Sequence, residues 1–245
     1  MHLYEHLLVA RVVSTVILKE GVQMKSVSFV FLICLVFFSS PSFSGEVLDD
    51  LPATIDISEK YIFFLHGNII EEKGVASAKS KEFGFYEYNK ILNAMGQHDF
   101  TVISEVRGDD TKIQAYAKKI AEKVNTLINN GVPPNQITVA GFSKGGKITL
   151  VASSLINNKL VNYVVLAGCI RKTKQFIEKF NLDLKGRVLS IVDYRDDTFS
   201  SCEEMFSSSS GGLEHKEFIL EDGGGHGVFY SPDDIWIKPM VDWIK

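Results

Sequence analysis

A serine framed by glycines is the first feature of the sequence that suggests chemistry. Ser143 is the centre of a G-x-S-x-G pattern, residues 141–145. The β-branched residues 137–139 before it predict a short buried strand, and residues 147–156 after it predict a helix. A serine at such a corner projects its hydroxyl from a strained turn, which requires small residues two positions away on either side. The pattern therefore predicts a nucleophilic serine.

Serine is also a favoured N-cap of helices, which gives the same pattern a purely structural interpretation. Short G-x-S-x-G matches arise by chance, so the position of Ser143 does not by itself establish a nucleophile. A reactive serine needs a base to remove its proton and a third group to orient that base. Candidates for both groups follow later in the chain.

Three carboxylates and one histidine follow the ends of the last two predicted strands. Asp193 ends the first of these strands, and Asp196 and Asp197 lie in the loop after it. His226 lies in the glycine-rich segment 223–227, after the second strand. The flanking glycines let this segment reach across a sheet toward a serine, which a solvated surface loop does not need. The residues alone leave open which carboxylate would orient the histidine.

Strands and helices alternate along the chain, which predicts a parallel sheet of about six strands with helices on both faces. The first strong strand, residues 60–65, is a nearly continuous apolar run, as is typical of a strand covered on both sides. The other predicted strands are 101–106, 137–139, 161–168, 186–193 and 215–220. The predicted helices are 85–95, 111–129, 147–156, 172–180 and 235–244. Residues 69–84 are polar and are predicted to form a loop.

With these elements in place, the chain resembles the α/β-hydrolase superfamily. Ser143, Asp196 and His226 reproduce its order of nucleophile, acid and histidine, each after a strand. Members often carry the acid three positions beyond the strand end, which favours Asp196 over Asp193 and Asp197. The carboxyl ends of parallel strands are also where ligand crevices form in α/β sheets. The resemblance therefore implies a catalytic triad.

The resemblance also implies two backbone donors for an oxyanion. A His-Gly pair, His66 and Gly67, ends the first strand, and in α/β-hydrolases such a pair begins the loop that supplies one N–H. The amide of Asn68 is the expected donor, and the amide of Lys144, directly after the nucleophile, is the second. Two such amides stabilise the charge of a tetrahedral intermediate. The imidazole of His66 is interpreted as structural.

These residues imply a serine hydrolase of carboxylesterase type, which cleaves a small-molecule acyl substrate through an acyl-enzyme without a cofactor. A thioesterase or peptidase is an alternative, because acyl specificity depends on pocket shape. A non-catalytic binding module is another, because fold does not imply function. Scattered histidines without Cys-x-x-Cys spacing give no prediction of a metal site. The net charge of −4 gives no indication of nucleic-acid binding, and the oligomeric state has no signal.

An apolar run near the N-terminus predicts export. Residues 26–38 follow Met24 and Lys25 and precede a small-residue site that ends at Ser44, as in a secretory signal peptide. The run is short for a membrane span, which needs about 20 apolar residues. We expect a signal peptide over 24–44, an upstream misread over 1–23, and one α/β-hydrolase domain over 45–245. An uncleaved anchor is the alternative to a periplasmic or secreted chain without stable membrane insertion.

Export predicts a disulfide. The mature chain would keep two cysteines, Cys169 after the fourth predicted strand and Cys202 shortly after the fifth. Successive strands are usually neighbours, so the pair is expected beside the loop that carries Asp196. Two buried thiols are the alternative.

The site is expected to be open. Residues 169–186 hold one short predicted helix and leave no room for the cap domain that superfamily members commonly insert there. The stretch before residue 60 is also short, which predicts reduced N-terminal strands. Only residues 69–84 and 198–212 remain to cover the site, and both are polar and expected to be mobile. We therefore expect small or soluble acyl substrates rather than long-chain lipid.

Overall fold

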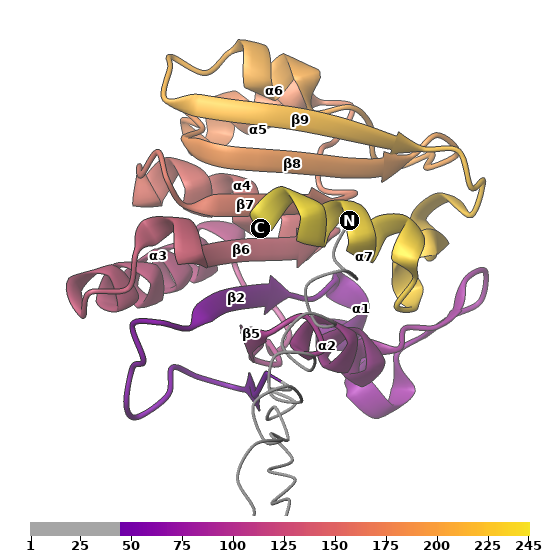
Figure 1. The fold of residues 1–245 in the computed structure, drawn as a ribbon. Coiled ribbons are helices and arrows are strands. Elements are labelled where there is room, and N and C mark those ends of the chain that lie inside the picture. The colour runs from indigo at the N-terminus through magenta and orange to yellow at the C-terminus, as the bar shows by residue number, and fades with distance from the viewer. Residues whose placement is uncertain (1–44) are drawn as a thin grey trace, which may run out of the picture. The chain divides into compact units, whose positions relative to one another are not determined.

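The computed structural model describes residues 45–245, in which seven strands form one parallel sheet (Figure 1). Their order is β1-β5-β2-β6-β7-β8-β9. The strands are β1 Val47–Leu48, β2 Lys60–Leu65, β5 Phe100–Ile103, β6 Ile137–Phe142, β7 Asn162–Leu166, β8 Gly186–Asp193 and β9 Leu213–Leu220. The predicted parallel sheet is confirmed, with seven strands instead of about six because the two-residue β1 pairs with β5 at the edge.

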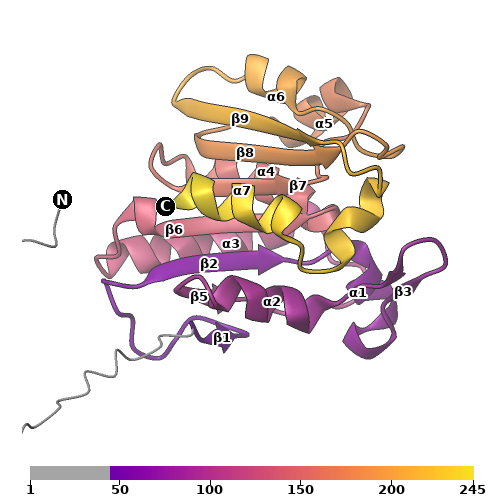
Figure 2. The same ribbon diagram turned by 45° about the vertical axis from the view of Figure 1, so that its right-hand side comes forward.

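Helices cover both faces of this sheet (Figures 1 and 2). They are α1 Asn68–Lys73, α2 Tyr88–Gly96, α3 Ile113–Asn129, α4 Lys144–Ile156, α5 Thr173–Phe180, α6 Glu203–Ser207 and α7 Asp234–Ile244. One face carries α2 and α7, and the other carries α3, α4, α5 and α6. Between β7 and β8 the chain forms only one helix, α5, so no cap domain is present at that position.

The central strand β2 shows why the sheet is buried on both faces. Tyr61, Phe63 and Leu65 pack against the core under α3 and α4. The alternate residues Ile62 and Phe64 pack against the core under α2 and α7. Successive side chains of a strand point to opposite faces, so a continuous apolar run fills both cores. Each of these buried side chains stabilises the fold by about 1.5–3 kcal/mol.

The order in which strands are added to the sheet reverses next to β2, and this reversal determines where a ligand crevice can form. The chain passes from β2 to β5 on one side and then crosses to β6 on the other, from which β7, β8 and β9 follow outward. Where the connections after two neighbouring parallel strands run to opposite sides, a crevice forms at the carboxyl ends of those strands. The ends of β2 and β6 therefore form the floor of the candidate site.

Residues 69–84 are not the predicted loop. They contain α1, a 3₁₀ turn Val75–Ser77, and a hairpin of β3 Lys79–Ser80 with β4 Gly84–Phe85. In α1 only Ile70 and Glu71 are buried, so the helix has no apolar stripe that the sequence would reveal. The predicted helix 85–95 likewise begins three residues late, at Tyr88, because Phe85 belongs to the hairpin.

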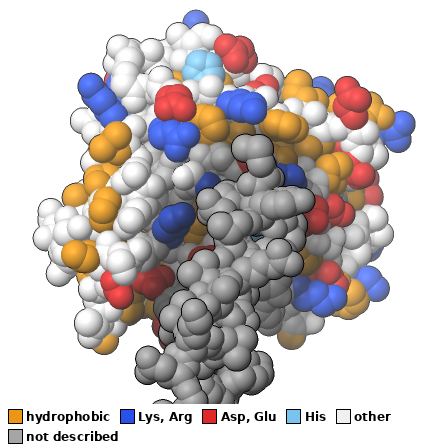
Figure 3. Space-filling view, viewed as in Figure 1, with side chains coloured by type: hydrophobic (Ala, Val, Ile, Leu, Met, Phe, Trp, Pro, Cys, Tyr) orange, Lys and Arg blue, Asp and Glu red, His pale blue; other side chains and the backbone are white. Residues whose placement is uncertain are grey.

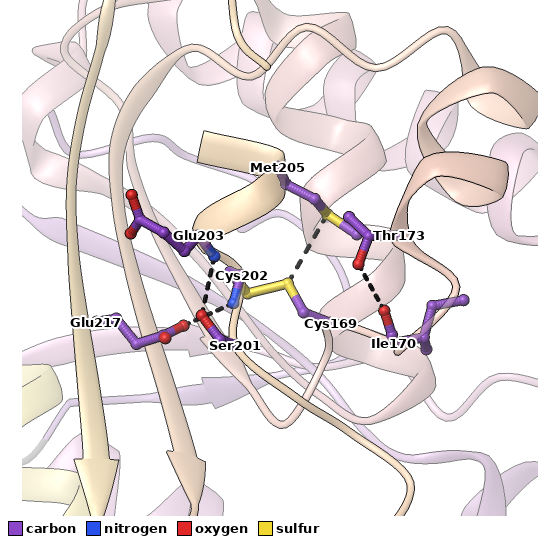
Figure 4. Close-up of a disulfide and its surroundings, with 8 residues drawn as sticks. All are labelled: Cys169, Ile170, Thr173, Ser201, Cys202, Glu203, Met205 and Glu217. Atoms are coloured by element: carbon purple, nitrogen blue, oxygen red, sulfur yellow. Dashed lines mark hydrogen bonds between the residues drawn. A yellow bond between two sulfur atoms is a disulfide. The ribbon is translucent and has the colours of Figure 1, made fainter. Parts of the chain in front are cut away.

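The segment 198–212, expected to be polar and mobile, is packed. It contains α6 and buries Cys202, Met205 and Phe206 against the core under α3 and α4, while Phe199 is buried in the core on the opposite face. The predicted disulfide is present and joins Cys202 to Cys169 in the loop after β7, with Cα atoms 5.3 Å apart. Figure 4 shows this bond beside Met205, with the Cys202 amide donating to the carboxylate of Glu217.

The predicted signal peptide, residues 24–44, and the upstream segment 1–23 lie outside the described residues. Across residues 45–245, none of the helices combines the length and apolar character that a membrane crossing requires.

Candidate active site

Ser143 lies at the corner between β6 and α4 with φ 56° and ψ −113°, a backbone conformation that residues other than glycine rarely adopt. The corner has no room for larger neighbours. A Cβ at Gly141 would lie 2.3 Å from the carbonyl oxygen of Gly145, and one at Gly145 would lie 1.8 Å from that of Leu65. The Ser143 side chain makes no capping hydrogen bond to α4 in this structure, so the capping interpretation is not supported. The strained corner presents a serine without giving it a structural role.

His226 and Asp196 are joined by a hydrogen bond. The distance from His226 Nδ1 to Asp196 Oδ2 is 2.7 Å, and the Asp196 side chain is 1% exposed. Its other oxygen accepts the amides of Thr198 and Phe199 at 3.0 and 2.9 Å. Burial raises the pKa of this carboxyl, but the hydrogen bonds from His226 and the backbone outweigh it and leave the pKa below its usual value. An ionised Asp196 holds the proton on Nδ1 and leaves Nε2 free to act as a base.

The two neighbouring aspartates lie elsewhere. Asp193 accepts hydrogen bonds from the backbone amides of Arg195, Gly223 and Gly225, all within 3.0 Å. It thus ties the loop of Asp196 to the loop of His226. Asp197 is exposed. Of the three carboxylates that the sequence offers, Asp196 is the one placed against the histidine.

Ser143 and His226 line one cavity of about 340 Å³ with Asn68. Its remaining walls are Gly67, Ile69, Glu72, Lys73, Ser80, Lys81, Phe142 and Tyr230. The described residues include no direct hydrogen bond between the Ser143 hydroxyl and His226; such contacts often tighten only with substrate. His226 also borders a second cavity of about 310 Å³, and the hairpin tip 80–83 contributes to both.

A larger groove of about 370 Å³ lies between β9 and α7 and contains none of these residues. Figure 3 shows hydrophobic side chains gathered among charged ones over this face. The groove is lined by Leu189, Phe218, Trp243 and side chains of both charges. It is larger than the cavity of Ser143 but holds none of the candidate catalytic residues.

The two predicted oxyanion donors each begin a helix. Asn68 is the first residue of α1 and Lys144 the first of α4, where amides have no partner within the helix. Gly67, just before Asn68, approaches the nucleophile closely, because a Cβ added to it would lie 3.6 Å from the Cβ of Ser143. Two helix N-termini at one cavity favour negative charge there.

His66 is buried and structural, as the sequence suggests. Its Nε2 accepts the amide of Arg107 at 2.9 Å, which leaves Nδ1 to donate to the carbonyl of Gly67 at 2.9 Å. Burial, reinforced by the Arg107 charge, lowers the pKa of His66 to about 3. The neutral ring therefore joins the end of β2 to the loop after β5.

A buried ion network under the site has no counterpart in the sequence analysis. Glu71 receives the Arg107 guanidinium at 2.8 Å and also pairs with the ammonium of Lys144. The Glu71 and Arg107 side chains are 2% and 0% exposed. The three residues are far apart in sequence and follow no motif, so only their contact reveals the network. Among residues 45–245, no cluster of histidine, cysteine or acidic side chains is arranged to hold a metal ion.

Comparisons with known proteins agree with this architecture. The profile of the phospholipase/carboxylesterase family matches residues 88–201, a range that includes Ser143 and Asp196. Arabidopsis thaliana SOBER1 has a TM-score of 0.50 at 16% identity over 76% of this chain and 97% of its own. A truncated carbohydrate esterase from gut microbiota has a TM-score of 0.50 at 16% identity, covering 79% and 87% of the two chains. An arylesterase has a TM-score of 0.50 at 14% identity over 76% of this chain and 77% of its own.

No curated protein sequence matches the chain significantly. The chain thus shares the fold of these esterases, and its residues 88–201 are similar to the phospholipase/carboxylesterase family.

Proposed function

We propose that the chain is an exported serine esterase that hydrolyses small or soluble acyl esters. The observation that carries this proposal is the shared cavity of Ser143, on its strained corner, and His226, which is held by Asp196. This arrangement supplies the nucleophile, the base and the group that orients the base. The disulfide is compatible with an oxidising compartment outside the cytoplasm.

The proposed reaction uses protein groups alone. Nε2 of His226 removes the hydroxyl proton as Ser143 Oγ attacks the ester carbonyl, and Asp196 stabilises the imidazolium that forms. The amides of Asn68 and Lys144 bind the oxyanion of the tetrahedral intermediate. The imidazolium then gives its proton to the leaving alcohol, which yields an acyl-enzyme. Water, deprotonated by the same histidine, releases the acid and restores the serine.

The cavity walls favour a small acyl group. Asn68, Glu72, Lys73 and Lys81 bring polar or charged groups to the cavity, and Ile69, Phe142 and Tyr230 are its larger apolar or aromatic members. A long alkyl chain would gain little from such walls and would desolvate charges. We therefore place the substrate among short-chain esters, with no role for nucleic acid.

Two experiments test this proposal. A fluorophosphonate probe should label the wild-type chain and fail to label Ser143→Ala, because only an activated serine reacts. The same pair should differ in hydrolysis of p-nitrophenyl acetate by at least about 10³-fold. Activity that survives Ser143→Ala would remove Ser143 from the mechanism. A folded wild type that is neither labelled nor active would favour a binding module, and a panel of thioesters and amides would expose a thioesterase or peptidase.

A further inference from the structure

The imidazole of His226 packs against two aromatic rings. The ring centroid of Phe199 is 4.7 Å from that of His226, with the planes only 9° apart. The ring centroid of Phe142 is also 4.7 Å from that of His226, and these two planes are 34° apart. Phe142 directly precedes Ser143, and Phe199 follows Asp196 by three residues. The segments that carry the nucleophile and the acid thus each add a ring against the base.

Phe199 is fixed from two directions. The residue is 6% exposed, and its amide donates to Asp196 Oδ1 at 2.9 Å. It also forms an antiparallel bridge with Ile170, and the next amide, of Ser200, donates to the carbonyl of Cys169 at 2.9 Å. Cys169 is in turn bonded to Cys202. The ring is therefore held both by the acid of the site and by the disulfide-linked loop.

A stacked ring supplies a constraint that the hydrogen bond lacks. The bond from Nδ1 to Asp196 holds one ring atom, but small coupled changes in the two side-chain torsions of His226 can still turn the ring plane without breaking that bond. Such a turn would swing Nε2 away from Ser143. A flat ring 4.7 Å away opposes the turn, because any large tilt would bring the two rings into collision. The face of Phe199 also attracts the imidazolium that forms during the proposed reaction.

We propose that Phe199 is a positioning residue for His226, and that the Cys169–Cys202 disulfide holds Phe199 in place. The inference rests on the proposed esterase function only for its kinetic effect. Without the stacked ring, His226 spends less time aimed at Ser143. The chemical step then slows, while substrate binding is unchanged.

Phe206 offers a matched control. Like Phe199, it is buried in the segment after β8 and stacks on a histidine, here His215, with centroids 4.5 Å apart. It lies on α6, outside both cavities that border His226. The change Phe206→Leu therefore removes a similar ring from the same segment without touching the site.

The kinetic test compares full-length variants on p-nitrophenyl acetate. Phe199→Leu should lower kcat about tenfold, which is about 1.4 kcal/mol in the barrier, and leave KM within about twofold, because the interaction acts on the base. Phe199→Tyr, which keeps the ring, should recover most of the rate. Phe206→Leu should retain wild-type kcat. Equal losses in both leucine variants, or a fall confined to KM, would overturn the proposal.

Proton NMR tests the geometry without any need for activity. The stacked ring should move the His226 carbon-bound ring protons upfield, as assigned by their absence in His226→Gln. Phe199→Leu should return these signals downfield, while Phe206→Leu should shift only those of His215. An unshifted His226 signal in the wild type, or one that ignores Phe199→Leu, would overturn the stacking. If the His226 signals shift as expected but the protein has no esterase activity, the proposed function is refuted and the stacking is not.

The disulfide is tested by the double change Cys169→Ser with Cys202→Ser. It should lower kcat and shift the His226 ring protons in the same direction as Phe199→Leu, and adding Phe199→Leu to it should cost little more. This variant and Phe199→Tyr also keep the proposal testable should Phe199→Leu not fold. Wild-type kcat and wild-type signals without the disulfide would show that it does not hold Phe199.

Discussion

The side chain of Lys144 pairs with Glu71, so the two helices that begin at the proposed oxyanion donors are joined by an ion pair. Glu71 lies three residues after Asn68 on α1, and Lys144 is the first residue of α4. The carboxylate is shared with the buried guanidinium of Arg107. This contact links the first turns of the two helices whose N-terminal amides would receive the oxyanion.

Breaking this network at its centre, Glu71, and at one end, Lys144, should have unequal effects. Glu71→Gln leaves Arg107 buried without its counter-charge and should lower the free energy of unfolding by about 3–5 kcal/mol. Lys144→Met removes only the partly exposed partner and should lower it by about 1 kcal/mol. Urea denaturation measures both values. Equal losses would mean that Arg107 does not depend on Glu71.

Three aspartates within five residues should separate into three roles. Asp196→Asn should lower kcat by about 10⁴-fold, because the amide no longer fixes the histidine tautomer. Asp193→Asn should lower the free energy of unfolding by about 1–3 kcal/mol, since three backbone amides lose their anionic acceptor. Asp197→Asn serves as the exposed control and should change neither quantity. Kinetics with chemical denaturation on all three variants decides; a larger kcat loss in Asp193→Asn would reassign the acid.

His66 should make stability depend on pH between about 6.5 and 3. The unfolded chain binds a proton near pH 6.5, whereas the folded protein binds it only near pH 3, because burial and Arg107 lower that pKa. Within this window unfolding takes up a proton, so the free energy of unfolding falls as pH falls, by up to about 1.4 kcal/mol per pH unit.

The change His66→Gln removes this titration. Plots of unfolding free energy against pH should run parallel for the two proteins above pH 7. Between pH 6.5 and 3 the variant should show the shallower slope, with other titrating groups cancelling in the comparison. Parallel curves throughout would mean that His66 is protonated in the folded protein near its usual pKa.

Acyl chain length should limit the rate. Hydrolysis of p-nitrophenyl esters should fall from acetate and butyrate to palmitate, because the cavity of about 340 Å³ has polar walls. Lys81→Leu replaces one charged wall residue and should move the preference toward the longer chains. A clear preference of the wild type for palmitate, or a jump in rate at an oil–water interface, would contradict the expectation of an open site for soluble esters.

The sequence by itself determined the parallel sheet and the order of the candidate residues. β2 and β8 have their predicted bounds, and β2 in particular shows the nearly continuous apolar run of a strand buried on both faces. The corner at Ser143 is equally local, since the glycines around it are required by contacts within one turn and with the adjacent strand. These features depend on neighbouring residues, and neighbours are what a sequence displays.

Only the tertiary structure decided which residues meet around the site. The contact of Glu71 with Lys144 spans 73 positions, and the short helix that carries Glu71 has no apolar stripe to announce it. The segment 198–212 looks polar and mobile, yet a disulfide and a few buried side chains hold Phe199 against His226. Such contacts arise from the packing of distant segments. The residues that make them therefore show no periodic pattern in the sequence.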